Sequence, residues 1–266
     1  MGSHTEANEA PLLSPGGAQR RSDSTGSTVI PVVPVASDRV LKPTNRLQMW
    51  IGTLGLAAAT FALYGRTIGT NFVGDDWLFL ATARAHSLSA LLSAGGGYHY
   101  NPLLNVIIFA MYHAFGLHPV PYHVLAYICF WLGSVLVMRL GWKITNNLGL
   151  GIIAGFLFVA FGTQYEAAVW GVVAYGPAVS TILYLAGLLS FTAAHNTELG
   201  RARRAGAYVG FLFALVLGPF VYEQDISLLG ACLLYRLLVL DADEAFSFRA
   251  LPGRFRAWVA DFALPG

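Results

Sequence analysis

Residues 47–64 read LQMWIGTLGLAAATFALY, an apolar run without a charged residue that sets the class of fold. An α-helix rises 1.5 Å per residue, so a helix of this length spans roughly the 30 Å hydrocarbon core of a bilayer. The composition agrees, because 56% of the 266 residues are hydrophobic and 11% are charged, against about 25% charged in a typical soluble domain. We therefore predict an all-α, multi-pass transmembrane helical protein.

Further apolar runs follow at 122–140, 148–161, 177–193, 207–222 and 226–240. With the first run they predict about six spans, in a transmembrane domain that covers residues 46–240. The run 102–117 is shorter and contains Asn105 and His113, so we predict a helix that lies in or near the outer membrane interface. Residues 76–92 predict a second interfacial helix in the same outer loop, which covers residues 66–121.

Basic residues predict the orientation of these spans. Arg39, Lys42 and Arg46 precede the first run, and basic residues at this place favour a cytoplasmic N-terminus. Threading six spans from that start places every Lys and Arg of the chain on the cytoplasmic side except Arg66 and Arg84. The loop after the first span is then expected outside the cytoplasm.

The two ends of the chain differ from its middle. Residues 1–45 are rich in Ser, Gly, Pro and Thr and predict a disordered cytoplasmic tail, because such a segment buries little apolar surface. Residues 241–266 predict a second cytoplasmic tail or the start of a further region. The net charge of +2 and the lack of a basic patch interleaved with aromatic residues argue against a nucleic-acid partner.

Carboxylates gather on the outer side of this topology. The acids at predicted outer helix ends and loops are Asp75, Asp76, Glu166, Glu223 and Asp225. Few outer basic residues are available to pair with them, so they predict a site for a metal, a cation or proton transfer. Gly74 and the two acids after it also precede an apolar helical run, which is typical of a helix N-terminus. Glu166 and Glu223 fit solvated helix ends equally well.

Five segments in order resemble the N-terminal part of the GT-C membrane glycosyltransferases, a group that includes the protein O-mannosyltransferases and other transferases that use polyprenyl-phosphate sugars. The segments are DDWLFL at 75–80, HYNPLLN at 99–105, FGLHPVPYHVLAY at 115–127, FGTQYEAAVW at 161–170 and YEQDISLLGACLLYRLL at 222–238. The resemblance covers about residues 71–240. It departs from the family at Tyr222, where a basic residue often stands. Full-length members usually continue with further spans, which predicts that this chain is a fragment or half of a site completed elsewhere.

The resemblance implies transfer of a sugar from a polyprenyl-phosphate donor to an acceptor outside the cytoplasm, which would be a glycan, a lipid or a protein. We expect an integral protein of the bacterial plasma membrane. Asp75 is then the expected base and Asp76 orients the site or binds a metal, because neighbouring helical residues point about 100° apart. Direct attack on the anomeric carbon would invert its configuration. Glu166 and Glu223 match acids of later outer segments, and Asp76 and Glu223 are the candidates for holding a divalent cation.

Other polar residues of the outer loop are candidates for substrate binding. His99, Tyr100 and Asn101 follow three consecutive glycines, a flexible turn that would let their side chains face one cavity and bind the donor phosphate or the acceptor. Anchoring of the loop at the membrane interface is the alternative. Arg84 would meet the donor phosphate, or serve as a surface anchor.

The alternative function is a non-enzyme, namely a membrane transport or lipid-binding subunit whose outer acids bind cations or steer a partner. Charges buried within the spans would favour transport. The apolar runs themselves contain no such acid, which favours the enzyme. His113, His118 and His123 recur every five residues, a spacing that does not place them on one helix face and predicts no metal site.

Overall fold

The computed structural model describes residues 43–93, 101–161, 170–237 and 253, and all regular structure among them is helical. The helices are α1 (Pro43–Tyr64), α2 (Asp76–Ala85), α3 (Leu88–Ser93), α4 (Pro102–Phe115), α5 (Pro119–Thr145), α6 (Leu148–Ala160), α8 (Tyr175–Ala194), α9 (Arg201–Val221) and α10 (Ser227–Tyr235), with short 3-10 turns η1 (Gly65–Thr67) and η2 (Glu223–Ile226). The predicted all-α class is confirmed. The predicted tail 1–45 lies outside the described residues up to residue 42, and of the predicted segment 241–266 only residue 253 is described.

Four helices within the described residues are long and apolar enough to cross a membrane: Arg46–Thr67, Pro119–Thr145, Tyr175–Ala194 and Arg201–Val221. They correspond to four of the predicted runs. The run 148–161 forms α6, which has 13 residues, and the run 226–240 contains α10, which has 9. Both are apolar helices that fall below the length of a full span.

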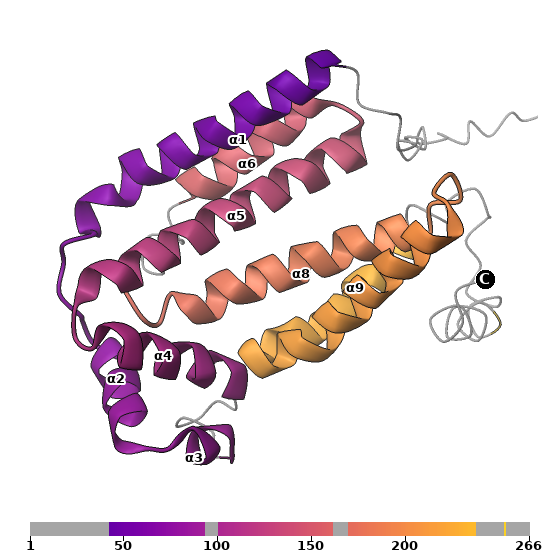
Figure 1. Ribbon diagram of the computed structural model, residues 1–266. Coiled ribbons are helices and arrows are strands. Elements are labelled where there is room, and N and C mark those ends of the chain that lie inside the picture. Colours follow the sequence, from indigo (N-terminus) through magenta and orange to yellow (C-terminus); the bar gives the residue numbers. More distant parts are fainter. Residues whose placement is uncertain (1–42, 94–100, 162–169, 238–252, 254–266) are drawn as a thin grey trace, which may run out of the picture. The chain divides into compact units, whose positions relative to one another are not determined.

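Helices α1, α5 and α6 lie side by side (Figure 1). Glycine allows the closest contact, because a Cβ on Gly151 of α6 would lie 2.5 Å from the carbonyl oxygen of Met138 in α5. The two helices are joined at Asn146, which has a φ of 55°, and Asn147 begins α6 by accepting a hydrogen bond from the N–H of Leu150. Left-handed backbone and an N-terminal Asn cap are typical of such a turn.

The helix directions follow from the pairs of residues that meet. Tyr122 near the start of α5 stacks on Tyr175 at the start of α8, with ring centroids 6.4 Å apart, so these two ends lie at the same level. Phe191 of α8 contacts Phe211 of α9, and Gly187, earlier in α8, faces Ala214, later in α9. The two helices are therefore antiparallel. The end of α9 and η2 therefore return to the level at which α8 begins.

The segment between α1 and α5 contains α2, α3 and α4, and α4 packs against both of the others. The predicted single helix over 76–92 is wrong in one respect, because the chain is extended at His86 and separates α2 from α3. The side chain of Ser87 accepts a hydrogen bond from the N–H of Ala90. Ser favours such local bonds at helix starts over a place inside a helix, so the break has a local cause.

Candidate functional site

The two adjacent acids at the start of α2 have opposite environments. Asp75 is the residue before the helix, its side chain is exposed, and it makes no capping hydrogen bond. Asp76 is the first helical residue and is 0% exposed. A burial difference of this size between neighbours indicates different roles, because a buried carboxylate needs partners and an exposed one keeps its oxygens accessible.

Four backbone N–H groups surround the carboxylate of Asp76. Those of Val73 and Gly171 donate to Oδ2 at 3.2 and 3.1 Å, and those of Val172 and Val173 donate to Oδ1 at 2.8 and 3.0 Å. An ionised carboxylate has about four lone-pair positions, so this set fills them. Hydrogen bonds to a charged acceptor are stronger than neutral ones and compensate the loss of water around the buried charge.

Residues 171–174 form the turn that leads into α8. Unpaired N–H groups at a helix start carry partial positive charge and favour an anion. Asp76 is that anion here, and it joins the start of α2 to the start of α8. The sequence pattern suggested a cap for the helix that follows the acids, whereas three of the four N–H groups belong to the entry of a different helix.

Aromatic packing holds the chain that leads into α2. Phe72 is buried between Trp77 and Tyr122, with ring centroids 5.5 and 5.2 Å away and near-perpendicular planes. The indole N–H of Trp77 donates to the carbonyl of Phe72 at 3.0 Å. Asp75 therefore stands on a backbone that is held from both sides, by the Phe72 contacts and by the Asp76 hydrogen bonds.

His123 of α5 packs against Thr70 and Gly171. Its position in the sequence did not mark it as a candidate site residue. Its side chain is fully buried, and Nε2 lies 3.2 Å from the carbonyl oxygen of Thr70. A Cβ on Gly171 would lie 3.4 Å from the same nitrogen. The five-residue spacing of the three histidines predicts no shared helix face. The importance of His123 comes from the packing of α5 against the segment 70–76, which the sequence does not reveal.

The remaining predicted residues are spread over the described structure. Arg84 is exposed in the last turn of α2, about 13 Å along the helix from Asp75 at 1.5 Å per residue. Asn101 precedes α4 and is buried, and Glu223 is exposed in η2. The neighbouring Tyr222 packs near Gly176 of α8, so η2 and Asp76 both approach the start of α8. His99, Tyr100 and Glu166 lie outside the described residues.

The expectation that Asp76 binds a metal is corrected by its hydrogen bonds, because four N–H donors occupy the lone pairs that a cation would need. Across the described part of the chain, no group of three or more His, Cys, Asp or Glu side chains is placed to hold a metal ion. The hydrogen bonds of Asp76 thus favour its orienting role, and the metal role of Glu223 stays a prediction.

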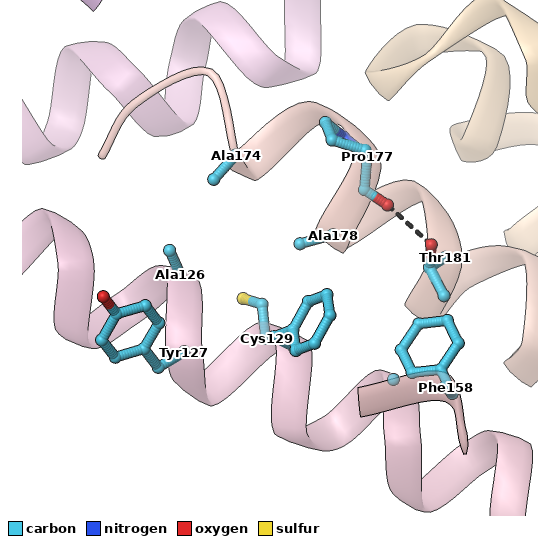
Figure 2. Close-up of a pocket in the computed structure, with 10 residues that line it drawn as sticks. Ala126, Tyr127, Cys129, Phe158, Ala174, Pro177, Ala178 and Thr181 are labelled. Carbon is cyan, nitrogen blue, oxygen red and sulfur yellow. Dashed lines mark hydrogen bonds between the residues drawn. The ribbon is translucent and has the colours of Figure 1, made fainter. Parts of the chain in front are cut away.

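A small cavity lies between α5, α6 and α8 (Figure 2). Its lining is mostly apolar and is made by Ala126, Tyr127, Cys129, Phe130, Gly133, Phe158, Ala174, Pro177, Ala178 and Thr181. Its volume of about 10 Å³ is near the minimum for one water molecule. A sugar or a prenyl chain does not fit there.

Comparison with family models, with curated proteins and with solved structures found no match to this chain. What the fold and the site define is a class, an all-α protein with helices of membrane-spanning type. Within that class, this chain places an exposed aspartate beside a buried one at the first loop after α1.

Proposed function

We propose that this protein is a membrane glycosyltransferase of the GT-C type. It moves a sugar from a polyprenyl-phosphate donor to a glycan, lipid or protein acceptor outside the cytoplasm, with inversion at the anomeric carbon. In this proposal the protein lies in the bacterial plasma membrane with a cytoplasmic N-terminus, and Asp75 faces the extracytoplasmic side.

The main support for the proposal is that Asp75 is exposed whereas its neighbour Asp76 is buried and hydrogen-bonded. Transfer requires a hydroxyl or amine acceptor to attack the anomeric carbon while the phosphate leaves, and a base must take the acceptor proton. The Asp75 carboxylate is exposed, and within the described residues it makes no hydrogen bond or ion pair. Asp76 holds the adjacent backbone through four hydrogen bonds, which is the rigidity that a positioned base needs.

The surface next to Asp75 supports a lipid-linked substrate. Val73, Trp77 and Leu78 are 40, 50 and 62% exposed. Exposed apolar side chains close to the end of a membrane-type helix suit an interface with lipid. Arg84 is proposed to contact the donor phosphate, and Glu223 is proposed to contact the substrate from η2. His99, Tyr100, Asn101 and Glu166 keep the substrate-binding roles that the resemblance implies.

The proposal is tested with full-length protein in liposomes that contain mixed polyprenyl-phosphate sugars and labelled acceptors. Wild-type protein is compared with Asp75→Asn, and Glu198→Gln serves as the matched control because Glu198 is an exposed acid in the turn between α8 and α9. We expect transfer by the wild type and the control and its loss in Asp75→Asn. Equal transfer by all three would reject Asp75 as the base, and a wild type without transfer would reject the enzyme.

The second candidate is a non-enzymatic transport subunit, and one observation favours it. Asp225 was expected at an outer helix end, but its carboxyl is buried against Ser180 of α8, and buried acids beside membrane helices are typical of transporters. The same liposomes distinguish the two functions. Cation or proton flux without sugar transfer would support transport, whereas transfer without flux supports the enzyme.

A further inference from the structure

Asp225 follows α9 in the short turn η2, and its side chain is 3% exposed. The hydroxyl of Ser180 donates a hydrogen bond to Oδ1 of Asp225 at 2.6 Å. Ser180 is itself buried and lies five residues after the start of α8, about 8 Å along the helix axis. This contact binds η2 to the side of a helix that is long and apolar enough to span a membrane.

The second oxygen of this carboxyl has no such partner. Oδ2 of Asp225 is buried and accepts or donates no hydrogen bond in the described part of the chain. It lies directly against the backbone of α9, because a Cβ on Gly218 would be 2.8 Å from it. A charge on an oxygen in this position would lack both water and a donor, and such a charge is strongly disfavoured.

The elements around Asp225 place no charged hydrogen-bond partner on its carboxyl within the described residues. Their titratable and charged groups within the described residues are Tyr175 and Tyr184 on α8, Arg201, Arg203, Arg204 and Tyr208 on α9, Glu223 in η2 with Tyr222 before it, Cys232, Tyr235 and Arg236 on or after α10, and Tyr112 and His113 on α4. The arginines of α9 lie at its other end, about 20 Å from Gly218 along the axis. Glu223 is exposed and, as an acid, it would disfavour a second negative charge.

We infer that Asp225 and Ser180 form a buried proton-binding site, in which Oδ2 carries the proton and the neutral acid keeps η2 packed between α8 and α9. The ligand is a proton from water, and binding converts the carboxylate to the acid with no other bond changed. Burial raises the pKa of Asp225 above its ordinary value, and the hydrogen bond from Ser180 partly opposes this shift. Loss of the proton creates an unpaired buried charge, which is relieved when η2 leaves Gly218.

The proton-binding site also affects Glu223, and it does not depend on the proposed transferase activity. Glu223 and Asp225 belong to the same 3-10 turn, so release of Asp225 also moves Glu223. Protonation of one buried acid therefore controls the position of an exposed one near the start of α8. A protein without transferase activity would contain the same proton-binding site.

The direct test is infrared difference spectroscopy during a pH titration of the full chain in lipid nanodiscs, with ¹³C-labelled aspartate carboxyls. The wild type is expected to keep the carbonyl stretch of a protonated aspartate at a pH above the ordinary aspartate pKa of 3.8, because burial raises the pKa of Asp225. The band should disappear in Asp225→Asn and persist in Asp75→Asn, which removes an exposed carboxylate. A wild type that lacks the band at this pH, or a band that persists in Asp225→Asn, would overturn the site.

A second measurement follows the packing of η2. Asparagine has nearly the shape of the protonated acid and cannot ionise, so hydrogen exchange of residues 222–227 should become pH-independent in Asp225→Asn after correction for the intrinsic rate. In the wild type these amides should exchange faster as the pH rises. Gly218→Ala places a methyl group 2.8 Å from Oδ2 of Asp225, closer than the two can pack, and should give fast exchange at every pH. Wild type and Asp225→Asn with the same pH profile would contradict the proposal.

Discussion

The carboxylate of Asp76 and the backbone N–H of Val172 are 96 residues apart in the chain and are joined by a 2.8 Å hydrogen bond. With the bonds from Gly171 and Val173, this contact connects the start of α2 to the entry of α8. It makes Asp76 a positioning residue, whereas its neighbour Asp75 is exposed.

Asp76→Asn should destabilise the protein although the change is small in volume. An amide keeps one acceptor oxygen and turns two N–H donors toward backbone N–H groups, so buried donors lose their partner. We expect a loss of about 3 kcal/mol in the free energy of unfolding, measured by denaturant titration in detergent. Asp75→Asn removes an exposed carboxylate and should change stability by less than about 0.5 kcal/mol. Equal stability of the two variants would show that the four hydrogen bonds contribute nothing.

Asp75→Asn should act on the rate of transfer. Removal of a general base typically lowers a rate by 10² to 10⁴-fold, so we expect kcat to fall by about 100-fold or more while KM changes little. Steady-state assays at varied concentrations of the lipid-linked donor provide both values. A rise in KM with kcat unchanged would instead assign Asp75 to substrate binding.

Gly151→Ala tests the contact between α5 and α6. The new Cβ would meet the Met138 carbonyl oxygen at 2.5 Å and the Trp142 nitrogen at 2.8 Å, both of them backbone atoms that cannot rotate away. We expect a loss of about 2 kcal/mol, within the range for overpacked cores. Gly206→Ala is the control, because Gly206 lies in α9 with nothing within 4 Å of its Cβ position, and Ala favours a helix by about 1 kcal/mol over Gly. Opposite signs for the two variants are therefore expected.

The stability of the wild type should depend on pH through Asp225. Because its pKa in the fold is above the ordinary value of 3.8, the folded state retains the proton while the unfolded chain has already lost it. The contribution to stability is complete below the ordinary pKa and is lost as the pH rises through the folded pKa. Unfolding midpoints measured between about pH 4 and 8 should fall with pH by a larger amount in the wild type than in Asp225→Asn. Parallel curves would exclude Asp225 as the source.

Residue composition and the lengths of the apolar runs predicted the class of fold and the approximate positions of the main helices. The run 122–140 lies inside α5 (Pro119–Thr145), and the run 102–117 contains α4 (Pro102–Phe115). These are local properties, because apolar length and the absence of charge decide where a membrane-type helix forms. The sequence also marked Asp75 and Asp76 as a pair of interest without separating their roles.

Which of the two acids is exposed and which is buried depends on contacts between distant parts of the chain. Asp76 differs from Asp75 because of N–H groups at 171–173, and Asp225 is buried because α9 brings it back to Ser180, 45 residues earlier in the chain. Likewise His123 joined the site through the packing of α5 on Thr70. The environment of a polar side chain depends on partners that are distant in sequence. A local pattern of residue types therefore does not predict those contacts.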